Sequence, residues 1–132
     1  MKLTKDQVAS VVMEASQKMG DPNYSAVMVG GFVQSQTPVA QFISAHEREL
    51  GGADMIVNVI FHCALVAQCF QRAGSKIRTL SYEDLDFAAR GEPLARLEAA
   101  QLPLHEFIKA NIENEEAQKI VAMIALAIDG MS

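Results

Sequence analysis

The most apolar stretch of the chain lies near its middle, from Asp54 to Arg72. On a helical wheel at ~100° per residue, its apolar side chains cover most of the circumference. A helix that is apolar over most of its surface belongs in a protein interior. The run from Met55 to Phe70 is shorter than the ~20 apolar residues that cross a membrane, and polar residues interrupt it. The pattern therefore predicts a buried core helix and no membrane span.

The polar side chains of this stretch gather on one side of the predicted helix. Asp54, Asn58 and His62 follow each other at intervals of four residues, and Cys69 and Arg72 return to nearly the same side. The ordinary explanation is that the helix ends reach solvent and that neighbouring helices satisfy the middle. The alternative is a polar seam that binds a small ligand or a protein partner. These five residues are the candidate site.

Capping residues and prolines divide the rest of the chain into further helices. The expected starting points are Thr4, Asp21, Thr37, Ser81, Pro93, Pro103 and Asn114. Residues 26–33 are ambiguous, because Gly30 and Gly31 could form a hairpin turn between two strands. A lone hairpin is marginal, and no other strand candidate extends a sheet. We therefore predict an all-α fold, a compact bundle of about seven to eight helices.

Two segments of the chain resemble each other. Residues 36–46 read QTPVAQFISAH, and residues 101–111 read QLPLHEFIKAN, with Gln, Pro, Phe, Ile and Ala at matching positions. Upstream of them, LTKDQV from Leu3 resembles LSYEDL from Leu80. The resemblance predicts an internal duplication. The alternative is that two amphipathic helices share ordinary N-terminal proline chemistry.

The duplication predicts two copies of a four-helix unit, about residues 3–74 and 80–130, within a single domain of residues 1–132. The long apolar helices of the two copies would bury each other at the centre. Aligning IVNVIF with IVAMIA matches Asn58 and His62 with the apolar residues of the second copy. By this alignment the polar seam belongs to the first copy alone.

Composition narrows the functional class. A chain of 132 residues is expected to form one domain, and its core must be aliphatic because aromatic residues make up only 6%. The formal net charge is -5, and no basic cluster stands out, which argues against binding to nucleic acids or membrane surfaces. The N-terminus lacks an apolar signal core. The two cysteines, Cys63 and Cys69, lie ~9 Å apart along one helix, too far for a disulfide. We expect a cytoplasmic protein with free thiols.

Motifs for catalysis or metal binding do not occur in the sequence. His46, His62 and His105 are the only histidines, and their spacing matches no metal site. The nucleophile-elbow, phosphate-loop and dinucleotide-binding patterns are absent. Cys69 could be a reactive thiol beside Arg72, although a buried, inert cysteine is the commoner case. We predict no metal and no cofactor.

The leading hypothesis is therefore a non-enzymatic, cytoplasmic helical protein that acts by protein–protein interaction as a homodimer. It rests on the apolar excess of nearly every predicted helix. The alternative is a small-ligand-binding module that uses Asp54, Asn58 and His62. An enzyme ranks last, because the titratable groups show no arrangement for catalysis.

Overall fold

The computed structural model describes residues 1–131, which form nine helices and no strand. The helices are α1 (Lys5–Lys18), α2 (Pro22–Ser35), α3 (Thr37–Ser44), α4 (Glu47–Leu50), α5 (Ala53–Arg72), α6 (Tyr82–Ala88), α7 (Pro93–Ala100), α8 (Leu102–Asn111) and α9 (Glu115–Met131). The all-α prediction is confirmed. The count exceeds the expected seven to eight because the helix that begins at Thr37 breaks after Ser44, so that α4 is separate.

Local sequence signals place the helix starts. Thr4 before α1 and Ser81 before α6 each form a capping box, in which side chain and backbone at the helix start bond to each other. Asp21 caps α2 by accepting a hydrogen bond from the Asn23 N–H at 2.9 Å. The ambiguous segment of residues 26–33 lies inside α2, so the helical interpretation is confirmed and the hairpin is excluded.

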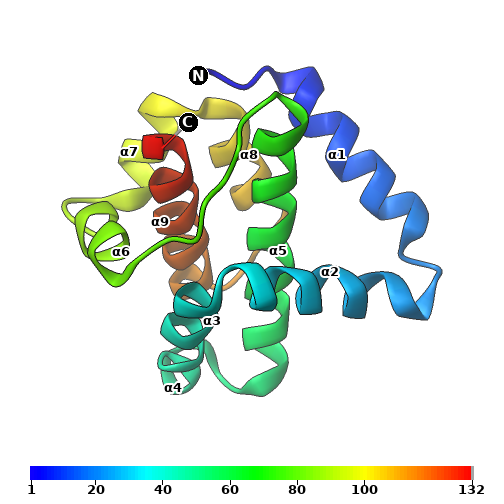
Figure 1. Cartoon of the computed structure of the whole chain (residues 1–132), viewed down its shortest axis with the longest axis horizontal. Helices are drawn as coiled ribbons and strands as arrows, with labels where there is room; N and C mark the ends of the chain where they lie inside the picture. The colour runs from blue at the N-terminus through cyan, green and yellow to red at the C-terminus, as the bar shows by residue number, and fades with distance from the viewer. Residues whose placement is uncertain (132) are drawn as a thin grey trace.

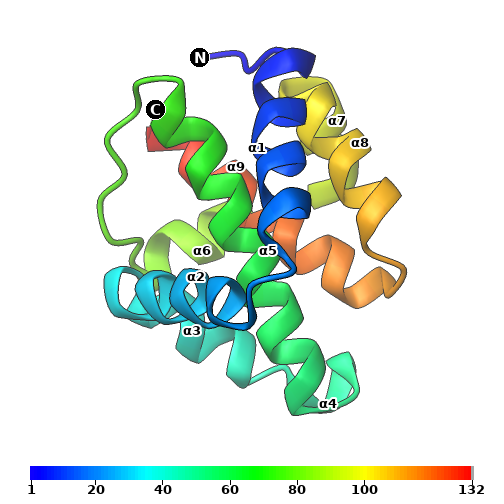
Figure 2. The ribbon, with the colours of Figure 1, turned by 90° about the vertical axis from the view of Figure 1, so that its right-hand side faces the viewer.

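The two long apolar helices, α5 and α9, pack against each other at the centre of the molecule (Figure 1). The predicted pairing is therefore confirmed. Helices α1, α2 and α3 pack on α5, and helices α6, α7 and α8 pack on α9 (Figure 2). Each central helix is apolar over most of its surface, and the other central helix covers only one side of it. Shorter helices cover the remaining apolar sides.

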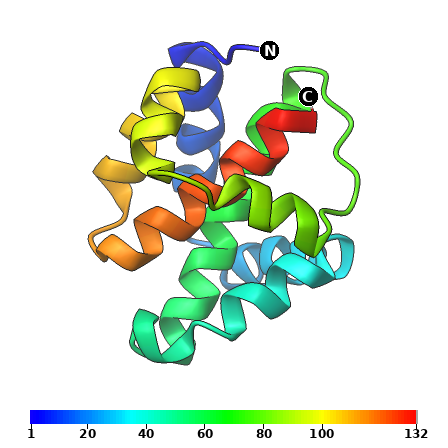
Figure 3. The same cartoon turned by 90° about the vertical axis from the view of Figure 1, so that its left-hand side faces the viewer.

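A long strap of residues 73–81 joins the end of α5 to the start of α6 (Figure 3). It crosses the molecule without regular structure, and Leu80 near its end is fully buried. The N-terminal segment before α1 is extended as well and lies close to the C-terminal end of α9.

Within residues 1–131, one helix is long and apolar enough to cross a membrane, namely α5. In its most apolar window 61% of the residues are buried inside the protein. The core helix of a soluble protein shows burial of this kind.

Candidate functional site

The structure divides the predicted polar seam of α5 into separate environments. Asp54 and Asn58 are exposed near the start of α5 and line a shallow groove of about 360 Å³. Its other wall is the link between α8 and α9, residues 111–114. None of the other three predicted seam residues lines this groove. The five predicted residues are therefore not brought together in one cavity.

His62, on α5, is buried and its ring contacts α8. Its Nδ1 is 2.8 Å from the carbonyl oxygen of Asn58, one helical turn back, and donates to it. The ring packs against Phe61 and Phe107, with centroid distances of 5.8 and 5.9 Å. Burial lowers the pKa of His62, although the Asn58 carbonyl opposes this effect. The neutral, hydrogen-bonded ring is a packing element at the contact between α5 and α8.

Cys69 and Arg72 lie at the other end of α5, beside α1. Burial raises the pKa of the Cys69 thiol to about 12, and the positive charge of Arg72 offsets only part of that effect. The thiolate is therefore scarce at neutral pH, which supports the inert interpretation. Arg72 is exposed and forms an ion pair with Glu14 of α1, which also pairs with Lys18 at 2.7 Å.

The histidines do not form a metal site. His46 precedes α4, where its Nδ1 donates to the Phe42 carbonyl oxygen at 2.8 Å and its ring stacks on Phe42. His105 on α8 lies 3.9 Å from the carboxylate of Glu98. In the described part of the chain, no three His, Cys, Asp or Glu side chains lie close enough to hold a metal ion.

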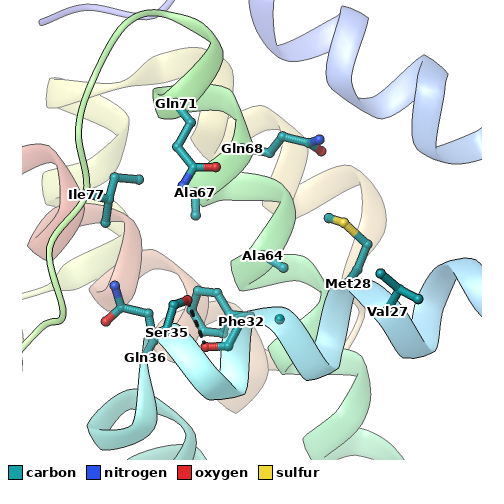
Figure 4. Close-up of a pocket in the computed structure, with 11 residues that line it drawn as sticks. Val27, Met28, Phe32, Ser35, Gln36, Ala64, Ala67, Gln68, Gln71 and Ile77 are labelled. Carbon is teal, nitrogen blue, oxygen red and sulfur yellow. Dashed lines mark hydrogen bonds between the residues drawn. The ribbon is translucent and has the colours of Figure 1, made fainter.

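A second groove lies between α2, α5 and the strap (Figure 4). It has a volume of about 250 Å³ and no charged side chain in its lining. Small residues of facing helices, Gly31, Ala64 and Ala67, leave the space open. Gln68 and Gln71 from α5 supply amide groups to its wall. The groove thus combines an apolar floor with uncharged polar groups.

The exposed face of α2 continues from this groove and carries no charged residue. Val27, which lines the groove, is 70% exposed. Gly30 and Gly31 are exposed in the middle of the helix, and a Cβ added at either would meet no atom within 4 Å. Among the hydrophobic residues of α2, Phe32 alone is buried. Tyr24, Met28, Val29 and Val33 pack partly against the core, so Val27 is the large hydrophobic side chain that α2 leaves exposed.

An absence of charged residues distinguishes this part of the sequence, although its hydrophobic periodicity does not. No Asp, Glu, Lys or Arg occurs from Pro22 to His46, although the rest of the chain is rich in charge. Asp21 and Glu47 flank the uncharged segment. A surface helix of a protein with a net charge of -5 normally carries charged residues, so their absence over α2 marks this helix as unusual.

Comparison with known proteins identifies no relative. No protein-family model matches the chain, and no curated protein or solved structure is significantly similar to it. The function must therefore be argued from the surfaces and contacts of the chain itself.

Proposed function

We propose that the chain is a non-enzymatic, cytoplasmic protein that acts through protein–protein contact, and that its partner is a second copy of itself bound through α2. The observation that carries the proposal is the exposed, uncharged face of α2, where Val27 is 70% exposed beside a groove without charged lining. An exposed apolar side chain that continues into an uncharged groove can be covered by a partner without burying charge.

Charge favours a second copy as the occupant. Two copies of a chain with a net charge of -5 repel each other over most of their surfaces. The face built from residues 22–46 carries none of that charge, so it can meet its own counterpart without like-charge contact. A twofold dimer places the same patch on both sides, which an uncharged apolar helix face satisfies.

The glycines of α2 support close approach of a partner helix. Each glycine inside a helix costs about 1 kcal/mol relative to alanine. No contact within the chain requires Gly30 or Gly31, because the space above both is empty. In a dimer, the missing side chains would let two helix backbones approach closely. Since one 14-residue helix per copy supplies most of the contact, we expect a weak dimer, with a dissociation constant roughly in the micromolar range.

Size-exclusion chromatography with light scattering tests the proposal. We expect the mass of two chains at about 100 micromolar protein, and dissociation on dilution. Val27→Glu places a charge in the centre of the face and should weaken the dimer at least about tenfold. The matched control is Val57→Glu, at another exposed valine, which lies on α5 and is 48% exposed. A strict monomer at the highest concentration, or equal effects of both variants, would refute the proposal.

The alternative is a small-ligand-binding module at the groove of Asp54 and Asn58. Its support is that two predicted seam residues line one groove. It is the weaker candidate, because His62 is engaged in the core and Arg72 pairs with α1. Asn58→Ala tests it: if no small polar compound raises the melting temperature of the wild type more than that of the variant, the groove is not a ligand site.

A further inference from the structure

A buried glutamine holds the strap in place before α6. Gln36, at the junction of α2 and α3, donates from Nε2 to the Arg78 carbonyl oxygen at 2.8 Å. Its Oε1 accepts a hydrogen bond from the Leu80 N–H, also at 2.8 Å. Leu80 is fully buried, and the next residue, Ser81, caps α6. One amide thus binds two backbone groups of an extended segment that ends in a buried leucine and a helix cap.

A second buried glutamine holds the N-terminal segment in the same way. Gln101, at the junction of α7 and α8, donates from Nε2 to the Met1 carbonyl oxygen and accepts at Oε1 from the Leu3 N–H at 2.9 Å. Leu3 is buried, and Thr4 caps α1. The backbone conformations also agree, since φ and ψ are -132° and 54° at Gln36 and -144° and 72° at Gln101.

The contacts between helices also repeat in the two halves of the chain. When α1, α2, α3 and α5 are exchanged with α6, α7, α8 and α9, every substantial helix contact outside α4 maps onto another one. Thus α1 packs on α8 as α6 packs on α3, and the central pair of α5 and α9 maps onto itself. Helix α4 has no counterpart.

The fully buried residues of α5 and α9 show which positions of the two central helices correspond. On each helix a series of fully buried residues is spaced by four, three and four positions. The two series are Val59, Cys63, Val66 and Phe70 on α5, and Ala117, Val121, Ile124 and Ile128 on α9. By this correspondence His62 matches Ile120, and Asn58 matches Glu116. The sequence alignment of IVNVIF with IVAMIA had instead matched Asn58 with an apolar residue. The position of Asn58 is then polar in both halves.

From these observations we propose that residues 1–74 and 75–131 are two related units that bind each other as separate partners would. Each unit carries a binding site, centred on Gln36 or Gln101, for the extended leading segment of the other. The ligand of each site is a backbone stretch that ends in leucine followed by a Ser or Thr helix cap. The covalent strap between the units is then a tether that their association does not need.

The chemistry of the site explains its selectivity for an extended segment. A glutamine amide has a donor and an acceptor side by side, which match a backbone C=O and an N–H two residues further on. Both backbone groups would be costly to bury without these bonds. The leucine adds apolar burial next to the amide. This inference concerns association within one chain, and it does not depend on the proposed dimer through α2.

Cleavage of the strap in the folded, full-length protein tests the inference. A protease recognition sequence is inserted between Gly74 and Ser75, and the chain carries Val27→Glu to suppress self-association through α2. After cleavage, we expect the two pieces to elute together with the mass of one chain and to keep the circular dichroism of the uncut protein. Separation of the pieces at micromolar concentration, or loss of the helical signal on cleavage, would overturn the proposal.

Substitutions in the cleaved protein test the two glutamine sites. Gln36→Leu and Gln101→Leu should each raise the dissociation constant of the two pieces by at least about tenfold, because each leaves two backbone groups unbonded. The control is the exposed Gln17→Leu, which should change it less than about twofold. If Gln36→Leu does not fold, Gln36→Glu keeps the acceptor for Leu80 but sets a buried carboxylate oxygen against the Arg78 carbonyl, so it should also raise the dissociation constant. An effect at one glutamine but not at the other would contradict the reciprocal arrangement.

Discussion

At the scale of single residues, the distinction between a functional and a structural polar group depends on its partners. His62 looked like part of a polar seam, yet its ring lies among aromatic side chains and donates to the carbonyl of its own helix. For Cys69 the sequence favoured an inert thiol over one activated by Arg72, and burial raises its pKa to about 12. In both cases the dominant physical effect is desolvation, which acts on the charged form of the group.

Burial of His62 makes stability depend on pH. Its folded pKa lies below the ordinary value of 6.5, so the unfolded chain binds its proton more tightly. Stability is then fully present above about pH 6.5 and falls as the pH drops below that value towards the folded pKa. We expect a lower urea midpoint at pH 5.5 than at pH 7.5, and a smaller difference in His62→Leu. Equal pH dependence of the two proteins would show that His62 does not contribute.

At the scale of elements, α2 packs on α5 with one face and leaves Gly30 and Gly31 exposed to solvent. Its caps and helical periodicity are regular, but its outer face has no contact that explains its glycines. By contrast, Gly51 and Gly52 after α4 have φ angles of 95° and 130°, which side chains other than glycine rarely adopt. Glycine is thus required by conformation after α4 and not by conformation within α2.

This contrast leads to a prediction for the glycines. Gly30→Ala and Gly31→Ala should each raise the free energy of unfolding of the monomer by about 1 kcal/mol, because alanine favours the helix. The same changes should weaken the dimer if two helices approach there. Gly51→Ala serves as the control and should destabilise by about 1 kcal/mol. Chemical denaturation at low protein concentration and light scattering at high concentration measure the two effects, and a destabilised Gly31→Ala monomer would contradict the prediction.

At the scale of the whole molecule, the two central helices bring the chain ends together. One amide nitrogen, Nε2 of Gln101, donates both to the Met1 carbonyl and, at 2.8 Å, to the Asp129 carboxylate. The beginning of the chain is therefore anchored beside the end of α9 (Figure 1). The strap begins beside this junction, where the Ser75 hydroxyl donates to the Met1 sulfur at 3.4 Å, and Gln36 holds its last residues.

This geometry predicts that the chain tolerates circular permutation. Joining residue 132 to residue 1 through a short Gly-Ser linker and opening the chain after Gly74 should preserve the fold, because the contacts of α5 with α9 and of both glutamines remain possible. Circular dichroism and a cooperative urea transition like that of the parent chain are expected. A permuted chain without a cooperative transition would show that the strap is needed for folding.

Much of the fold could be predicted from the sequence alone. Capping residues such as Thr4 and Ser81, prolines at helix starts and the apolar run of α5 act over a few neighbouring residues, so they can be recognised without a structure. The pairing of α5 with α9 also followed, since two helices so apolar can only bury each other. The break between α3 and α4 did not follow, because the residues around it favour a continuous helix.

The tertiary structure alone decided which polar groups are buried and what they bind. Gln36 and Gln101 stood out in the sequence only as matching letters, and their bonds to segments far along the chain appear when those segments meet. Likewise, the groove beside α2 forms where α2, α5 and the strap meet, and residues of all three line it. Helix formation is local and is written into neighbouring residues, whereas burial, hydrogen-bond partners and surface grooves depend on contacts between distant parts of the chain.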